Sequence, residues 1–163
     1  KETYPNTHLI FTEGCNYPYD GAKVKDWNWG ENYGVAMIND FNAGVEGWTD
    51  WNILLDETGG PNHVKNFCYA PVHADTKTGE LIYTSAFYYI GHFSKFVRPG
   101  AKRLIASSTI DRLLTTAFIN TDGSIAVVVM NNSAEAQPFT LNVGSNAATV
   151  DSPAHSILTL VVR

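Results

Sequence analysis

Hydrophobic residues follow two different patterns along the 163-residue chain, and the change falls near residue 97. Before it, apolar runs alternate with segments in which apolar residues recur every three or four positions, which is the spacing of an amphipathic helix. After it, short apolar runs follow one another closely and are separated by turn-forming residues, as in sheets built from consecutive strands. We therefore predict two domains, residues 1–97 with mixed strands and helices and residues 98–163 with strands alone.

Each part has a definite predicted order of elements. The segment HLIFTEGC, residues 8–15, is typical of a strand, and residues 30–45 place Tyr33, Met37 and Phe41 on one face of a helix. Further along the first part we predict a buried strand over 46–55, an extended hairpin over 69–84, and an aromatic-faced helix over 85–96 that Pro99 and Gly100 end. In the second part we predict strands over 102–108, 113–120, 124–132, 137–144, 147–153 and 155–163.

The predicted fold class is α/β plus all-β. Alternating strands and helices indicate a parallel sheet covered by helices, and two such strands alone would leave unpaired edges. We therefore interpret the first part as the last two strand–helix units of a (β/α)8 TIM barrel, an architecture of about 250 residues, with the other units upstream of Lys1. The closely spaced strands of the second part indicate an antiparallel β-sandwich.

Composition excludes several classes of protein. The net charge of −5 and the absence of a Lys/Arg cluster argue against a nucleic-acid partner. The longest apolar runs, such as IAVVVM, are too short for a transmembrane segment. Two cysteines, Cys15 and Cys68, do not make a disulfide framework or a zinc site, although a single bridge between them stays open. The start KETYPN carries no visible secretory signal, so the location cannot be read from it. We expect a secreted or periplasmic rather than a cytoplasmic location.

A carboxylate stands at the end of the first predicted strand. In a (β/α)8 barrel the active site lies at the carboxyl ends of the strands, so Glu13 would point into the barrel mouth. Aromatic and polar residues follow the second strand, which suits a sugar with apolar faces and hydroxyl edges. Glycoside hydrolysis uses two carboxylates, and Glu13 is a candidate for one of them. Asp50 lies on the opposite face from Trp51 by strand parity, and we expect it to have a structural hydrogen-bonding role.

Four segments together resemble glycoside hydrolase family 30, and its glucosylceramidase-like branch in particular. They are LIFTEGC, GVEGWTDWNILLDETGGPNHVKNF, FYYIGHFSKFVRPGAKR and DGSIAVVVMNNS, and they occur in the family's order over nearly the whole chain. The resemblance implies a retaining β-glycosidase with a (β/α)8 barrel and an attached β-sandwich. It also implies a carbohydrate or glycolipid substrate and no metal or organic cofactor.

The resemblance also implies roles for particular residues. Glu13 matches the family's nucleophile at the end of barrel strand seven, and Trp51 matches the tryptophan beside the sugar at the end of strand eight. Cys15, Asn66 and Phe67 match residues that line the substrate pocket. The family's general acid/base is a Glu preceded by Asn, and no Asn-Glu dipeptide occurs here, so we expect that residue in an upstream barrel segment.

Three other interpretations stay open at this point. In the first, the chain is a non-catalytic fragment whose β-sandwich serves as a packing or carbohydrate-binding module. In the other two, the whole enzyme is a β-1,6-glucanase or a β-xylosidase of the same family. Glu13-Gly14-Cys15 replaces the Glu-Ala-Cys that glucosylceramidases often carry, which leaves the natural substrate undecided. His63 is a possible substrate contact, whereas His92 is expected to be a hydrogen-bonded packing residue.

Overall fold

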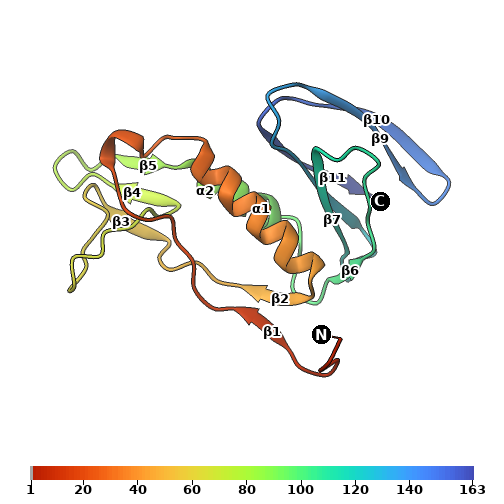
Figure 1. The fold of residues 1–163 in the computed structure, drawn as a ribbon, viewed down its shortest axis with the longest axis horizontal. Helices are drawn as coiled ribbons and strands as arrows, with labels where there is room; N and C mark the ends of the chain where they lie inside the picture. The colour runs from red at the N-terminus through yellow and green to blue at the C-terminus, as the bar shows by residue number, and fades with distance from the viewer. Residues whose placement is uncertain (1) are drawn as a thin grey trace. The chain divides into compact units, whose positions relative to one another are not determined.

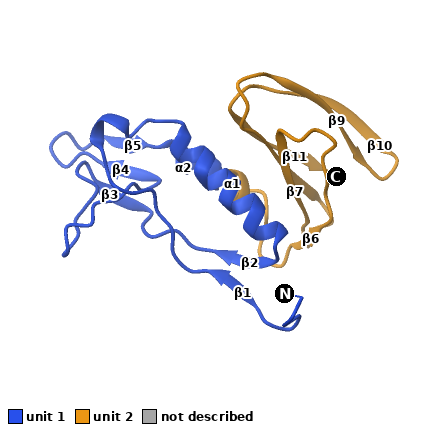
Figure 2. Cartoon of the chain, viewed as in Figure 1, with its two compact units in different colours: residues 1–90 blue, residues 91–163 orange. Residues whose placement is uncertain are grey.

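The computed structural model describes residues 2–163. The chain forms two compact units, residues 1–90 and residues 91–163, and the boundary between them along the sequence falls within one helix (Figure 2). The first unit mixes helices with short strands, and the second consists mainly of strands (Figure 1). None of the helices in the described part of the chain is long and apolar enough to cross a membrane.

A parallel strand pair with its connecting helix opens the first unit. β1 (Leu9–Phe11) is followed by a short 3-10 helix, η1 (Gly21–Lys23), by α1 (Asn28–Asn42) and by β2 (Val45–Trp48). β1 and β2 run parallel, with Leu9 opposite Val45 and Phe11 opposite Trp48. Two parallel strands need such a crossover, and α1 supplies it while burying an apolar face that includes Tyr33, Met37 and Ile38. This arrangement confirms the predicted first strand–helix unit.

A small second sheet follows the parallel pair. β3 (Leu54–Asp56) pairs parallel with β4 (Val72–Ala74), which in turn pairs antiparallel with β5 (Leu81–Tyr83). The predicted hairpin over 69–84 is confirmed, but the prediction of one buried strand over 46–55 is wrong. The chain leaves β2 after Trp48 and joins a different sheet at Leu54, and Ile53 between them is 78% exposed.

Helix α2 (Ser85–Ser94) begins directly after β5, close to its predicted range. Its first turn lies against the start of α1, because the Gly30 amide donates a hydrogen bond of 2.9 Å to the Ser85 hydroxyl. Tyr89 on the same helix is fully buried, and its ring meets Trp27 edge to face at 5.6 Å. The two helices therefore form the packed centre of the first unit.

The second unit is a sandwich of two antiparallel sheets. One sheet has the order β11–β8–β7–β6, and the other is the β9–β10 hairpin. Phe139 and Leu141 of the hairpin pack on a core of Leu113, Ala117, Val127 and Val129 from the larger sheet. The strands lie at β6 (Lys102–Leu104), β7 (Leu113–Ile119), β8 (Ile125–Asn131), β9 (Gln137–Val143), β10 (Asn146–Ser152) and β11 (Ser156–Val162).

All six strands of the second unit occur where the hydrophobic pattern predicted them. A pocket of about 560 Å³ opens in this unit, and its lining includes the apolar side chains of Leu113 and Phe139 and polar residues such as Thr115 and Asn142. The predicted role of His92 as a hydrogen-bonded packing residue is confirmed, since its Nδ1 lies 2.9 Å from the Thr159 hydroxyl.

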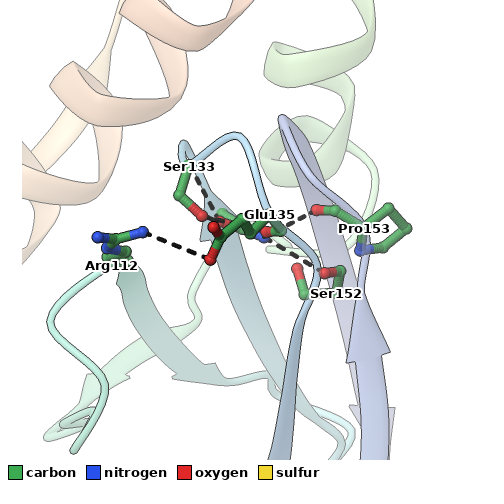
Figure 3. Close-up of polar contacts among 6 residues, drawn as sticks. Arg112, Ser133, Glu135, Ser152 and Pro153 are labelled. Carbon is green, nitrogen blue, oxygen red and sulfur yellow. Dashed lines mark hydrogen bonds and ion pairs between the residues drawn. The ribbon is translucent and has the colours of Figure 1, made fainter.

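Asn131 at the end of β8 joins the two turns that follow β8 and β10. Figure 3 shows Ser133 and Glu135 of the first turn and Pro153 of the second. Its amide nitrogen donates to the carbonyl oxygens of Glu135 at 2.8 Å and Pro153 at 2.9 Å, and its amide oxygen accepts from the Ser133 hydroxyl at 2.7 Å. The side chain is fully buried. The sequon Asn131-Asn132-Ser133 is therefore structural, because the nitrogen that would carry a glycan is enclosed and hydrogen-bonded in the fold.

Candidate active site

The carboxyl ends of β1 and β2 lie at the same edge of their parallel pair. Phe11 ends β1 and Trp48 ends β2, and their rings stack with centroids 4.6 Å apart and planes at 11°. Glu13 follows β1 by two residues, and Trp51 follows β2 by three. Open α/β sheets and barrels bind their ligands at this edge. The fold thus brings the candidate nucleophile Glu13 and Trp51, the candidate stacking residue for the sugar, to one edge.

Backbone hydrogen bonds continue past the two strands and tie these segments together. The Thr49 amide donates to the Phe11 carbonyl oxygen at 2.9 Å, and the Trp51 amide donates to the Gly14 carbonyl oxygen at 2.9 Å. A side chain at position 14 would place its Cβ atom 2.8 Å from the Phe11 ring, so an alanine there would require the ring to shift. Glu13 is exposed and Trp51 is 43% exposed, which leaves both side chains open to a ligand.

Asp50 lies beneath this edge and contacts both a helix and a strand end. Its Oδ1 atom accepts hydrogen bonds from the Tyr33 hydroxyl at 2.8 Å and from the Trp51 amide at 3.0 Å. Its Oδ2 atom is buried and has no hydrogen-bond partner among the described residues. Burial raises the pKa of Asp50 to about 6, although the hydrogen bonds from Tyr33 and Trp51 act in the opposite direction.

Cys15 lies between the strand-end carboxylates and a second cysteine. Desolvation raises the pKa of its thiol to about 12, and a hydrogen bond with the Cys68 thiol and the charges of Asp50 and Glu13 act in the same direction. Cys68 is buried, and both cysteines are free. A thiol that stays protonated is a poor nucleophile, so Cys15 suits a pocket wall better than covalent catalysis.

The loop between β3 and β4 carries the remaining candidate residues. Asn62 organises its tip, because its side-chain oxygen accepts from the amides of Val64 at 2.9 Å and Asn66 at 3.1 Å. The other end of the loop is bound to the segment after β1, where the Tyr19 amide donates to the Phe67 carbonyl oxygen at 3.1 Å. The side chains of Asn66 and Phe67 are exposed, and Phe67 packs beside Gly60.

The same segment of chain after β1 therefore contacts both Trp51 and the loop that carries Asn66 and Phe67. Hydrogen bonds join Gly14 to Trp51 and Asn16 to Tyr69, the latter at 3.0 Å. Sequence reasoning missed two members of this region, Tyr33 and Cys68. Tyr33 occupies an apolar position of the predicted helix. The only signal in the sequence is its hydroxyl group, because a buried Tyr hydroxyl needs a hydrogen-bond partner.

Comparison with known proteins identifies the class that this fold and site define. The description "Glycosyl hydrolase family 30 TIM-barrel domain" matches residues 1–97, and "Glycosyl hydrolase family 30 beta sandwich domain" matches residues 100–160. The two units are accordingly the end of a (β/α)8 barrel and a β-sandwich. The chain belongs to glycosyl hydrolase family 30.

Curated relatives include two kinds of glycosidase. The lysosomal acid glucosylceramidase of Mus musculus is 38% identical over 144 residues, which are 85% of this chain and 28% of that protein. An endo-1,6-β-D-glucanase of Trichoderma harzianum is 26% identical over 163 residues, covering 90% of this chain and 32% of the relative. The chain thus spans about a third or less of the length of these relatives.

Solved structures show the same fold. SrfJ from Salmonella typhimurium superposes with a TM-score of 0.92 at 33% identity, covering 99% of this chain and 36% of that structure. An endo-β-1,6-glucanase superposes with a TM-score of 0.86 at 29% identity, covering 97% of this chain and 36% of that structure.

Proposed function

We propose that this chain supplies the nucleophile half of a retaining β-glycosidase that cleaves a β-glucoside-type substrate. Glu13 is the nucleophile in this proposal. What carries it is the placement of Glu13 and Trp51 at one edge of a parallel strand pair in a chain of this family. We also propose that residues 1–97 belong to the catalytic barrel and residues 98–163 to the sandwich domain, in line with the two family matches.

The reaction would proceed by double displacement. Ionised Glu13 attacks the anomeric carbon, the glycosidic C–O bond breaks, and the leaving oxygen takes a proton from a second carboxylic acid. Water then attacks the anomeric carbon, gives a proton to the second carboxylate and breaks the bond to Glu13, and the two successive inversions retain the anomeric configuration. A retaining pair needs its carboxyl groups about 5 to 5.5 Å apart, and we propose that an upstream barrel segment of the same protein provides the acid/base.

The other residues of the edge have supporting roles in this proposal. The Trp51 ring packs on the apolar face of the sugar, and the Asn66 amide bonds a hydroxyl group. Cys15 and Phe67 form walls of the pocket. The protonated state of Cys15 agrees with such a role, because its thiol stays neutral at working pH values.

The natural substrate divides into two candidates. The glucosylceramidase of mouse favours a glycolipid glucoside, whereas structural likeness to an endo-β-1,6-glucanase favours a β-1,6-linked glucan. Both place a β-linked glucosyl unit against the same edge. Hydrolysis of the two substrates by the complete protein, compared side by side, separates them.

The proposal is tested by trapping the covalent intermediate. A protein that joins this chain to its upstream barrel segment is treated with a 2-deoxy-2-fluoro-β-glucosyl fluoride, whose second step is slow. We expect one fluoroglycosyl group on the peptide that contains Glu13, and Glu13→Gln should lower kcat by about 10³-fold or more. The matched control Glu80→Gln, in the exposed β4–β5 turn, should leave kcat unchanged. A label on another residue, or normal turnover by the Glu13 variant, would overturn the proposal.

A further inference from the structure

We propose that Asp50 is a positioning residue whose carboxylate holds the Trp51 backbone against the segment that carries Glu13, and that it does so fully only in its ionised state. The consequence for catalysis rests on the function proposed above. The positioning itself rests on hydrogen bonds and burial within the described residues. The catalytic steps assigned to Glu13 and an upstream acid make no use of Asp50.

The central feature is one backbone N–H that is shared by two acceptors. The Trp51 amide donates to the Gly14 carbonyl oxygen at 2.9 Å and to Asp50 Oδ1 at 3.0 Å. Because Gly14 follows Glu13 directly, this amide fixes the distance between the two strand ends. The Phe11–Trp48 ring stack fixes the same two segments one layer below. A change in the acceptor strength of Asp50 therefore acts on the relative position of Glu13 and Trp51.

Helix α1 supplies the other contact. The Tyr33 hydroxyl donates to the same Oδ1 atom at 2.8 Å, and the Tyr33 ring meets Trp48 edge to face at 5.5 Å. Tyr33 is buried, so its hydroxyl has little access to water as an alternative partner. Oδ1 thus joins helix α1 to the segment after β2, and the Trp51 amide of that segment also bonds the turn after β1.

The surroundings of Asp50 favour uptake of a proton on its other oxygen. Oδ2 is buried with no partner in the described part of the chain, whereas Oδ1 already accepts two hydrogen bonds. The titratable groups around it are the Tyr33 hydroxyl from α1, the Cys15 and Cys68 thiols, and the Glu13 carboxylate beyond Cys15. None of these is a cation. A neutral carboxyl accepts weaker hydrogen bonds than a carboxylate, so protonation loosens the hold on Trp51.

The geometry gives a direct test on the 163-residue chain itself. In protein labelled with ¹⁵N-tryptophan, the Trp51 backbone amide is followed by NMR while the pH is lowered from about 8 to about 4. We expect a single inflection near the pKa of about 6 that burial gives Asp50. In Asp50→Asn the inflection disappears. In Tyr33→Phe it moves to higher pH, because the lost hydrogen bond had favoured the carboxylate.

A matched variant separates this effect from general loosening. Asp40 accepts a hydrogen bond of 2.9 Å from the Trp48 indole, so Asp40→Asn should shift the Trp48 indole signal and leave the Trp51 inflection in place. The other tryptophan signals report whether each variant is folded. If Asp50→Asn does not fold, Tyr33→Phe still decides. An unmoved Tyr33→Phe inflection, or a wild-type Trp51 amide with no inflection between about pH 5 and 7, overturns the inference.

Activity of the chain joined to its upstream segment gives a second, separate readout. We expect Asp50→Asn to raise KM for an aryl β-glucoside more than it lowers kcat, with kcat/KM about tenfold below wild type near pH 7. The ratio of the two kcat/KM values should approach one near pH 5, where wild-type Asp50 is also neutral. A pH-independent ratio overturns the inference even if Glu13 is labelled as proposed. Conversely, a Trp51 inflection without labelling at Glu13 leaves the positioning in place and overturns the proposed function.

Discussion

Glu13 and Asp50 each lie two residues after the end of a strand, but their environments differ. Glu13 is exposed at the end of β1, whereas Asp50 is half-buried after β2 and shares its hydrogen bonds with a helix. Burial raises the pKa of Asp50 to about 6, so this carboxyl group takes up a proton at a mildly acidic pH. The exposed position of Glu13 agrees with the proposal that it is the nucleophile, and the hydrogen bonds of Asp50 agree with a positioning role.

A buried histidine predicts how stability depends on pH. His73 is fully buried, its Nδ1 lies 2.7 Å from the Asp56 carbonyl oxygen, and its Nε2 accepts from the Ala70 amide at 3.0 Å. The ring is therefore neutral, and desolvation lowers its pKa below the ordinary value near 6.5. Between that value and the lower folded-state pKa, the unfolded chain binds more protons, so the free energy of unfolding falls as the pH falls.

We expect His73→Gln to reduce this pH dependence. Urea unfolding near pH 7.5 and pH 5.5 should show that wild type loses about 1 kcal/mol more than the variant does. Comparing each protein at the same two pH values cancels the opposite contribution of Asp50. The exposed His63 provides the control, since His63→Gln should keep the wild-type dependence. An equal loss in His73→Gln and wild type would show that this ring does not drive the effect.

At the site, residue types and strand parity predicted part of what the structure contains. The position of Glu13 at a strand end and the hydrogen-bonding role of Asp50 followed from the sequence, and the structure gives Asp50 that role. The contact between Cys15 and Cys68 could not be predicted, because it depends on a loop that folds back over more than fifty residues. The roles of Glu13, Cys15, Trp51, Asn66 and Phe67 stay predictions until trapping and substitution test them.

At the scale of elements, hydrophobic periodicity predicted which segments form helices or strands better than it predicted which strands pair. The two helices and the six strands of the sandwich occur close to their predicted ranges. The error lies at residues 46–55, where one apolar run serves two sheets. Period alone does not reveal that Leu54 pairs with Val72, since that register depends on a contact eighteen residues away.

The crossing of α1 and α2 depends on a single glycine. A Cβ atom at Gly30 would lie 2.5 Å from the Tyr89 ring and 2.8 Å from Ser85 Cβ, with the Ser85 backbone carbon at 2.9 Å. Because backbone cannot move as easily as a flexible side chain, Gly30→Ala should lower the free energy of unfolding by about 1–3 kcal/mol. Urea unfolding followed by far-UV circular dichroism measures the change.

Gly91 in α2 is the matched control for this substitution. A Cβ atom there meets no atom within 4 Å, so Gly91→Ala should leave stability unchanged or raise it by up to about 1 kcal/mol through helix propensity. Equal stability of Gly30→Ala and wild type would show that the two helices do not need this close approach.

At the scale of the whole molecule, the first unit is the end of a (β/α)8 barrel and not a complete one. Its parallel sheet has two strands, and Ile10 of β1 is 61% exposed. The sandwich has a pocket of about 560 Å³ with a mixed polar and apolar lining. The resemblance noted from the sequence implies that an upstream segment completes the barrel, and this chain matches 28% of the mouse glucosylceramidase and 36% of the SrfJ structure. The two-stranded sheet agrees with the proposal that an upstream segment contributes to the active site.

We expect this chain alone to show no hydrolysis of an aryl β-glucoside. The reaction needs one carboxylate to attack the sugar and a second carboxylic acid to protonate the leaving group, and we expect the chain to carry only the first. Adding the upstream barrel segment, fused or as a separate polypeptide, should restore turnover, and the same mixture with Glu13→Gln should stay inactive. Release of the aryl group measured by absorbance checks all three. Steady turnover by the 163-residue chain alone would show that the acid/base lies within it, and Asp50 would then be the first residue to substitute because its raised pKa suits a proton donor. Binding of a glucan by the chain without turnover in any mixture would instead favour the non-catalytic, carbohydrate-binding interpretation.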